Sequence, residues 1–144
     1  YVKQLGAHLV FTYEEFVEQT LSIAKDGATV IFDSVAGEIT SDSLKCLAPF
    51  GTLVQFGNSS GRTGHFSNLD VHSSCRSVKG FSLGTTRKLK PEMIRPYAEK
   101  MIEQFASGAL HLQVDQIFEL KDVVNAHETF EKRQHNGKIL LKLS

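Results

Sequence analysis

Short runs of apolar residues alternate along the chain with stretches in which apolar residues recur every three or four positions. The runs are short and rich in β-branched and aromatic residues, which is typical of strands in a sheet. Continuous apolar strands are also typical of a parallel sheet that is covered on both faces. We expect strands at 8–11, 28–33, 52–56, 78–83, 114–120 and 139–143.

Helical spacing of apolar residues predicts helices between these strands. The first helix follows Thr12, which we expect to form a capping box with Glu15. Pro49 is expected to end the second helix, because proline disfavours the helical conformation of the residue before it. The apolar positions of this second helix are Leu44, Leu47 and Ala48.

The second half of the chain predicts two more helices. Pro91 suits a first helical position, but Pro96 would remove a backbone hydrogen bond one turn later, so we expect a kink or a late start. The stripe of this helix is Ile94, Ala98, Met101, Ile102 and Phe105. The last helix covers 122–132, with Val123, Val124, His127 and Phe130 facing inward. Strands and helices thus alternate throughout, and the sequence predicts an α/β fold.

Small polar residues follow two of the apolar runs. The run at 28–33 ends in Asp33 and Ser34, and the run at 52–56 is followed by Gly57-Asn58-Ser59-Ser60-Gly61. Two strands joined by a helical crossover are parallel, and such sheets bind ligands at the carboxyl ends of their strands. The segment 30–61 therefore predicts part of a nucleotide site, although the glycine-rich turn that holds phosphate in such sites is missing from the sequence.

Composition excludes several classes of partner. The 144 residues carry 16 basic and 16 acidic side chains, so no long-range field attracts nucleic acid or an anionic membrane. The apolar runs are shorter than the roughly 20 residues that span a bilayer. Two cysteines make no disulfide framework, which favours a cytoplasmic location. Cys46 is predicted to be a small buried residue on the second helix.

Two clusters offer other chemistry. His65, His72 and Cys75 lie close in sequence, but they lack the paired, tightly spaced ligands of a zinc site, and we predict no metal. The basic residues Arg87, Lys88 and Lys90 precede an expected helix start, where an anion could bind, but a solvated loop is the better explanation for them.

Four motifs lie in order over almost the whole chain. The first runs from Gly6-Ala7-His8 to Tyr13-Glu14-Glu15-Phe16, and the second is Asp33-Ser34-Val35-Ala36-Gly37. The third extends from Leu44 to Gly61 and the fourth from Ala126 to Leu141. Together they resemble the carboxy-terminal half of the medium-chain dehydrogenase/reductases, most closely the zinc-free quinone oxidoreductase branch. Ala36 departs from the glycine that is usual in the second motif.

The resemblance implies which residues border the cofactor. Tyr13 would lie near the adenosine ribose and its 2′-phosphate, and Ser34 and Val35 would border the adenosine or ribose. Residues at the nicotinamide end would be Phe56, Gly57, Asn58, Ser59, Phe81, Ser82, Leu83, Asn136, Gly137 and Lys138. No side chain is an obvious general acid, so no catalytic residue is assigned.

Each of these residues also has a purely structural interpretation. Tyr13 suits a half-exposed aromatic at a helix start, and Asp33 suits a cap of the helix that follows it. Gly57 and Gly61 are also ordinary turn residues. Lys138 is equally compatible with a solvated surface position.

The resemblance further implies the fold and the activity. The fold would be an incomplete Rossmann-type doubly wound parallel sheet lacking its first strands, in residues 1–108. Residues 109–144 would add a strand–helix–strand segment that packs on a catalytic domain outside this chain. The activity would be NADPH-dependent reduction of a quinone, enone or similar electrophile.

The missing parts lead to further expectations. Without the phosphate-binding turn, we expect the isolated chain to bind NADPH weakly and to lack turnover. In the order 3-2-1-4-5-6, strands 8–11 and 28–33 would be third and fourth, with the two missing strands between them. Unpaired strand edges favour self-association, so we predict a homodimer or strand exchange. A non-catalytic domain kept for binding or self-association is the alternative, and another Rossmann-like nucleotide binder is a third possibility.

Overall fold

The computed structural model describes residues 1–133 and 135–143 and divides into two compact units. The first unit is Val2–Pro91, and the second is Glu92–Ser144 together with Tyr1. The boundary predicted after residue 108 falls inside the second unit. Each unit is described below by itself.

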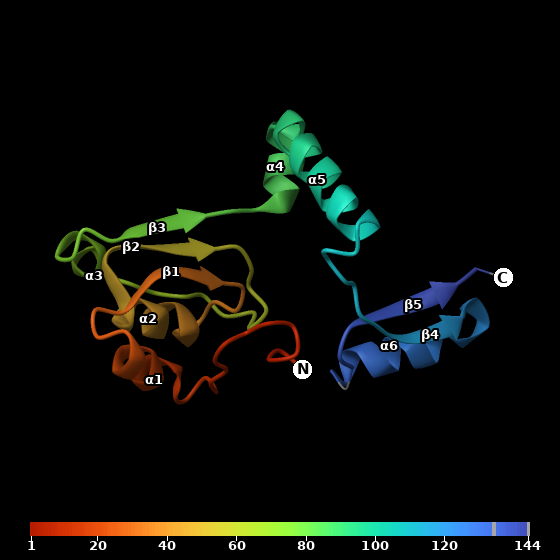
Figure 1. Cartoon of the computed structure of the whole chain (residues 1–144), viewed down its shortest axis with the longest axis horizontal. Helices are drawn as coiled ribbons and strands as arrows, with labels where there is room; N and C mark the ends of the chain where they lie inside the picture. The colour runs from red at the N-terminus through yellow and green to blue at the C-terminus, as the bar shows by residue number, and fades with distance from the viewer. Residues whose placement is uncertain (134, 144) are drawn as a thin grey trace. The chain divides into compact units, whose positions relative to one another are not determined.

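The first unit is built on a parallel sheet of three strands, β1 (Ala28–Asp33), β2 (Leu47–Gln55) and β3 (Ser77–Gly80), in the order β1-β2-β3 (Figure 1). In register, Leu53 of the central strand lies between Ile31 and Val78. The parallel pairing and the alternation with helices confirm the predicted α/β class and its Rossmann-like arrangement.

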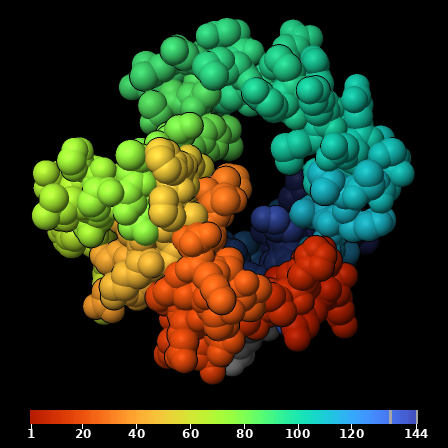
Figure 2. Space-filling model, turned by 60° about the vertical axis from the view of Figure 1, so that its left-hand side comes forward, coloured from red at the N-terminus to blue at the C-terminus, as the bar shows by residue number. Residues whose placement is uncertain are grey.

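One face of this sheet carries the core. Helix α2 (Glu38–Lys45) packs against β1 and β2, and helix α1 (Phe16–Ile23) packs against α2 (Figure 1). In the space-filling view these segments, coloured orange to yellow, form a continuous packed surface (Figure 2). The buried cluster consists of Leu44, Leu47 and Leu53, with Ile31 and Val78 packed against it.

The other face of the sheet is not covered by the described residues. Phe32 is 71% exposed, Val30 is also exposed, and the two side chains alternate with the inward-facing Ile31. The expectation that both faces of this sheet are buried is therefore wrong for the chain as it stands.

Three predictions from the sequence need correction. Residues 8–11 form no strand, because no described strand lies beside them to complete a hydrogen-bond ladder. The second helix ends at Lys45, and Leu47 and Ala48 begin β2 instead. Thr12 forms no capping box, since its hydroxyl donates to the Glu15 carboxylate at 3.2 Å and the helix begins only at Phe16.

Two short helices follow the sheet strands. Helix α3 (Asn68–His72) lies within the segment that we expected to be a long loop. Strand β3 ends at Gly80, and Leu83 already begins helix α4 (Leu83–Leu89), so the strand predicted at 78–83 is shorter than expected.

The second unit contains the remaining elements. A 3-10 turn (Pro91–Met93), which starts at the last residue of the first unit, precedes helix α5 (Arg95–Ala106), and Pro96 in the first turn of α5 confirms the late helix start. Strands β4 (Val114–Glu119) and β5 (Lys138–Lys142) pair in parallel and flank a 3-10 turn (Leu120–Asp122) and helix α6 (Val123–Glu131).

The inward face predicted for α6 is buried only in part in this chain, where Val123 is half-buried. Val124, His127 and Phe130 are exposed, and the buried residue of the helix is Ala126. A two-stranded sheet offers little surface to cover a helix stripe, so these side chains stay accessible. Among the described helices, none has the length and hydropathy that crossing a bilayer requires.

Candidate functional site

The carboxyl ends of the three sheet strands meet at one edge of the first unit. The backbone N–H of Phe56 donates to the Asp33 carbonyl at 2.9 Å, and the N–H of Phe81 donates to the Gln55 carbonyl at 2.9 Å. Both bonds continue the parallel ladder one residue past the strands. The segments predicted to border a cofactor therefore start side by side at the edge where parallel sheets bind ligands.

The loops that leave β1 and β2 are hydrogen-bonded to each other. The N–H of Ser59 donates to the Ser34 carbonyl at 3.1 Å, and the N–H of Ser60 donates to the Val35 carbonyl at 3.0 Å. Gly57 makes this possible, because a Cβ there would lie 2.7 Å from the Ser34 carbonyl oxygen. The predicted site residues Ser34 and Val35 are thus held against Gly57, Asn58 and Ser59. The two loops form one continuous wall.

Asp33 organises the turn between β1 and α2. Its carboxylate accepts hydrogen bonds from the N–H groups of Val35 at 2.8 Å and Ala36 at 3.0 Å, and from the Thr40 hydroxyl at 2.7 Å. Its exposed fraction is 3%. The residue at the N-cap of α2 is Gly37, which has no side-chain cap. Asp33 therefore holds the turn rather than capping the helix, and its carboxylate accepts three hydrogen bonds within the chain.

Thr40 and Gln55 extend this network, and sequence reasoning missed both. The Gln55 side-chain amide donates to the Gly57 carbonyl at 2.6 Å, and its oxygen lies 3.4 Å from the Thr40 hydroxyl. A polar side chain at the last position of an apolar strand is the sequence signal that marks Gln55. The network fixes the carbonyl of Gly57 and so the direction of the loop after β2.

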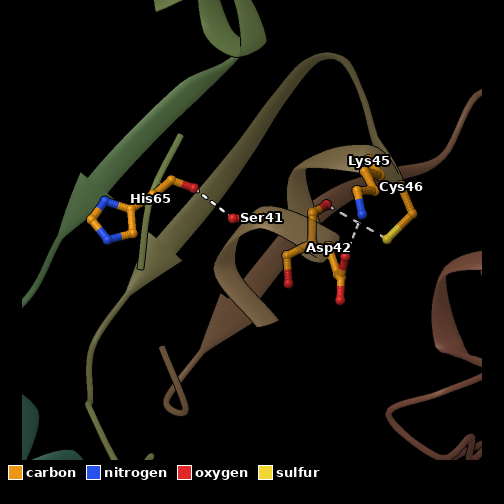
Figure 3. Close-up of polar contacts among 6 residues, drawn as sticks. Ser41, Asp42, Lys45, Cys46 and His65 are labelled. Atoms are coloured by element: carbon orange, nitrogen blue, oxygen red, sulfur yellow. Dashed lines mark hydrogen bonds and ion pairs between the residues drawn. The ribbon is translucent and has the colours of Figure 1, made fainter. Parts of the chain in front are cut away.

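The loop after β2 is also tied to α2. The Ser41 hydroxyl donates to the His65 carbonyl at 2.6 Å, and Figure 3 shows the His65 ring pointing away from the helix. One turn on, Lys45 pairs with Asp42 at 2.6 Å on the exposed side, and this hydrogen bond raises the pKa of Lys45 (Figure 3). Within residues 1–133 and 135–143, no three His, Cys, Asp or Glu side chains gather as a metal site would require.

A pocket of about 290 Å³ lies beside the end of β1. It is bounded by α1, by α2 and by the segment that precedes α1. The pocket brings together three residues that the sequence singled out, Tyr13, Ser34 and Val35, with Tyr13 largely exposed at its edge. The remaining lining residues are Phe11, Thr12, Phe16, Ile31, Phe32, Asp33, Ile39 and Ser43.

Other predicted site residues have different positions. Ser82 is the N-cap of α4, where its hydroxyl accepts from the N–H of Thr85 at 3.2 Å, and Leu83 is the first residue of that helix. Asn136, Gly137 and Lys138 belong to the second unit, at the start of β5. There the N–H of Lys138 donates to the Gln113 carbonyl at 2.8 Å.

The basic cluster lies elsewhere than expected. Arg87 and Lys88 are in the last turn of α4, and Lys90 is its C-cap residue. Cations at this end of a helix interact favourably with its free carbonyls, which explains the cluster without a bound anion.

Comparison with known proteins identifies similar sequences. The family of zinc-binding dehydrogenases matches residues 5–141. A quinone oxidoreductase of Pseudomonas aeruginosa is 31% identical over 139 residues, which cover 91% of this chain and 41% of that protein. The chain therefore spans about two fifths of the length of this curated relative.

Solved structures show the same fold. The structure of a 2-haloacrylate reductase matches 99% of this chain and 46% of its own, with a TM-score of 0.84 and 26% identity. A mycobacterial protein complexed with NADPH matches 97% of this chain and 44% of its own, with a TM-score of 0.79 and 24% identity.

Proposed function

The chain belongs to the zinc-binding dehydrogenase family, and we propose that it is the nucleotide-binding half of an NADPH-dependent oxidoreductase. The reaction would transfer a hydride to a quinone, an enone or a similar electrophile. The observation that carries the proposal is the hydrogen-bonded edge at which the ends of β1, β2 and β3 meet, beside a pocket that Tyr13, Ser34 and Val35 line. This is the edge where open parallel sheets bind dinucleotides.

The cofactor would lie along this edge. Its adenosine end would occupy the pocket beside Tyr13, Ser34 and Val35. Its nicotinamide end would follow the segments 56–59 and 81–83, where backbone groups orient the ring. NADPH supplies the hydride when it is bound, and the residues of this chain hold and orient the cofactor. Asn136, Gly137 and Lys138 of the second unit stay predicted cofactor-binding residues.

The relatives support the reaction class. One similar protein is a quinone oxidoreductase, another is a 2-haloacrylate reductase, and a third is described in complex with NADPH. Quinones and haloacrylates share an electron-poor double bond that accepts hydride. We extend this class of substrate to the protein that contains the present chain.

Zinc does not fit the residues that the structure describes. The candidate donors His65, His72 and Cys75 are not part of any cluster of three or more metal-ligating side chains in the described chain. A catalytic zinc needs three protein ligands and an open position. No step of the proposed reaction is therefore assigned to a metal.

Several properties of the whole protein are part of the same proposal. The segment 109–144 would pack on a catalytic domain, the protein would form a homodimer, and its location would be cytoplasmic. The 144-residue chain alone would bind NADPH weakly and would not turn over, because its sequence lacks a glycine-rich diphosphate turn.

An NMR titration of the isotope-labelled chain with NADPH at millimolar concentration tests the assignment. We expect amide shift changes at Ser34, Val35, Gly57, Asn58 and Phe81, and none along α5, which serves as the internal control. Changes along α5, or none at the sheet edge, would contradict the proposed site. A parallel assay with NADPH and a quinone is expected to show no turnover, and measurable turnover would refute the inactivity of the isolated chain.

A further inference from the structure

Asn136 and Gly137 form the peptide that leads from α6 into β5. Helix α6 ends at Glu131 and β5 begins at Lys138, so this peptide belongs to neither element. The side chain of Asn136 is on an exposed residue. Glycine has no Cβ, so the backbone nitrogen that follows Asn136 is not shielded from the amide group of its side chain. The peptide is therefore a candidate for a reaction between the two groups.

The backbone nitrogen of Gly137 takes no part in the hydrogen bonds that hold this turn. The bond at the turn is made one residue later, where the N–H of Lys138 donates to the Gln113 carbonyl at 2.8 Å. Among the hydrogen bonds of the described residues, none uses the N–H of Gly137. Attack by this nitrogen on the side chain of Asn136 therefore requires no hydrogen bond to open first.

The other three asparagines of the sequence are placed differently. Asn58 is followed by Ser59, whose N–H donates to the Ser34 carbonyl at 3.1 Å. Asn68 is the first residue of α3, and Asn125 lies within α6. In all three cases the next residue carries a Cβ that hinders access to its nitrogen. Asn136 is thus the asparagine whose surroundings least oppose cyclisation.

We propose that Asn136 is a deamidation site, at which the folded chain converts to aspartate and isoaspartate. The Gly137 nitrogen loses its proton and attacks the side-chain carbonyl carbon of Asn136, the bond from that carbon to the side-chain nitrogen breaks, and ammonia leaves. Water then opens the resulting cyclic imide at either of its two carbonyl groups. One water is consumed for each ammonia released, and no other reactant is needed.

Isoaspartate does not fit the backbone at this position. It adds one main-chain carbon between residues 136 and 137, where a Cβ on Gly137 would already lie 2.6 Å from the Gln113 carbonyl oxygen. The added atom displaces Lys138, which donates to the same oxygen and pairs with Val114 at the start of the β4–β5 ladder. Both products also add a negative charge beside Lys138. The reaction does not depend on the proposed function, although it alters a residue that is predicted to bind the cofactor.

Peptide mass analysis of the folded chain during incubation at neutral and alkaline pH tests the proposal. We expect the peptide that contains Asn136 to show the mass change of an amide replaced by a carboxyl group, and to become a substrate for isoaspartyl methyltransferase. The rate should rise with pH, because the attacking nitrogen must lose its proton. In the isoaspartyl form, the Lys138 amide should exchange about fivefold faster, which is the effect of losing one ordinary hydrogen bond. Unchanged exchange at Lys138 would overturn the structural consequence.

Ser59→Gly is the matched control, because it places a glycine after Asn58 as well. The N–H of residue 59 must first release the Ser34 carbonyl, so Asn58 of this variant should react about fivefold more slowly than Asn136 in the folded chain. In urea the two asparagines should react equally fast. Equal rates in the folded chain would overturn the inference, and so would an Asn136 that reacts in urea but not in the folded chain. The unmodified chain, compared with and without urea, decides the matter even if Ser59→Gly does not fold.

Discussion

Gly57 passes so close to Ser34 that a Cβ at Gly57 would lie 2.7 Å from the Ser34 carbonyl oxygen and 3.1 Å from its Cα. The same stretch carries the hydrogen bond from Ser59 to the Ser34 carbonyl. The close approach and the hydrogen bond together hold the two strand-end loops in one wall. A side chain at position 57 would have to displace backbone, which the rigid ends of two paired strands resist.

The first prediction is that Gly57→Ala destabilises the first unit. We expect a loss of about 1–3 kcal/mol in the free energy of unfolding, because overpacking against backbone forces the loops apart. Urea unfolding followed by circular dichroism measures it. Gly80→Ala is the matched control, since a Cβ at Gly80 would meet nothing within 4 Å. Equal effects of the two substitutions would contradict the close approach.

The second prediction concerns Phe50, which has a φ of +61° and is 79% exposed. A side chain in the left-handed region is strained, whereas glycine adopts it freely. We expect Phe50→Gly to be more stable than Phe50→Ala by about 1 kcal/mol, although alanine is usually the better residue in regular structure. Chemical denaturation of both variants checks the difference. Both variants lack the phenyl ring, so the comparison isolates the effect of the backbone conformation. If Phe50→Ala were the more stable variant, the backbone at position 50 would not be strained.

The sequence predicted a strand at each of β1 to β5, because short runs of apolar and β-branched residues favour extended backbone, although the bounds of β2 and β3 differ from the prediction. It failed at residues 8–11, since a short apolar run does not reveal whether a partner strand is present. It also failed at Leu47 and Ala48, whose helical spacing continues that of α2. Pro49 indicates an extended conformation for Ala48, because the residue before proline prefers that conformation.

Tertiary contacts explain why the helix ends where it does. The guanidinium of Arg76, almost thirty residues away, donates to the Leu47 carbonyl and to the Ala48 carbonyl at 3.4 Å. In addition, the N–H of Ala28 donates to the Cys46 carbonyl at 2.8 Å. Contacts at such separations leave no periodic signal in a sequence.

The third prediction separates the two cysteines. Cys46 has an exposed fraction of 0%, whereas Cys75 is exposed. A thiol reagent such as Ellman's should label Cys75 in the folded chain and label both residues in denaturant, because thiolate chemistry needs access. The Cys75→Ser variant should show no rapid labelling when folded. Fast labelling of that variant would mean that Cys46 is accessible.

Burial also makes the contribution of Cys46 to the free energy of unfolding depend on pH. Burial raises the pKa of the Cys46 thiol, so the folded state retains this proton better than the unfolded state does. The stability from this group is therefore complete below the ordinary thiol pKa of about 8.5 and declines as the pH rises above it. We expect Cys46→Ala to weaken the alkaline decrease of the free energy of unfolding, measured by urea titrations from neutral to alkaline pH. An unchanged alkaline slope would contradict the thiol's contribution.

The last prediction concerns the start of α3, where Ser67 and Asp70 form a capping box. The Asp70 carboxylate accepts from the Ser67 N–H at 2.6 Å and from its hydroxyl at 2.9 Å, and these bonds, with help from the positive charge of Arg76, lower the pKa of Asp70. A lowered acid pKa stabilises the folded state above the ordinary value of about 3.9, and this stabilisation is lost as the pH falls through the lowered pKa.

Carbon-detected NMR titration of Asp70 should therefore show a pKa below the ordinary value, and Ser67→Ala should bring it back upward. Ser73→Ala is the control, because the Ser73 hydroxyl donates to the Leu69 carbonyl at 2.6 Å at the other end of α3 and does not touch Asp70. The protection of the α3 amides relative to their intrinsic exchange rates should fall in acid in the unmodified chain, since protonation removes the acceptor of the cap. A normal Asp70 pKa, or an equal shift in both serine variants, would show that the capping box does not form in solution.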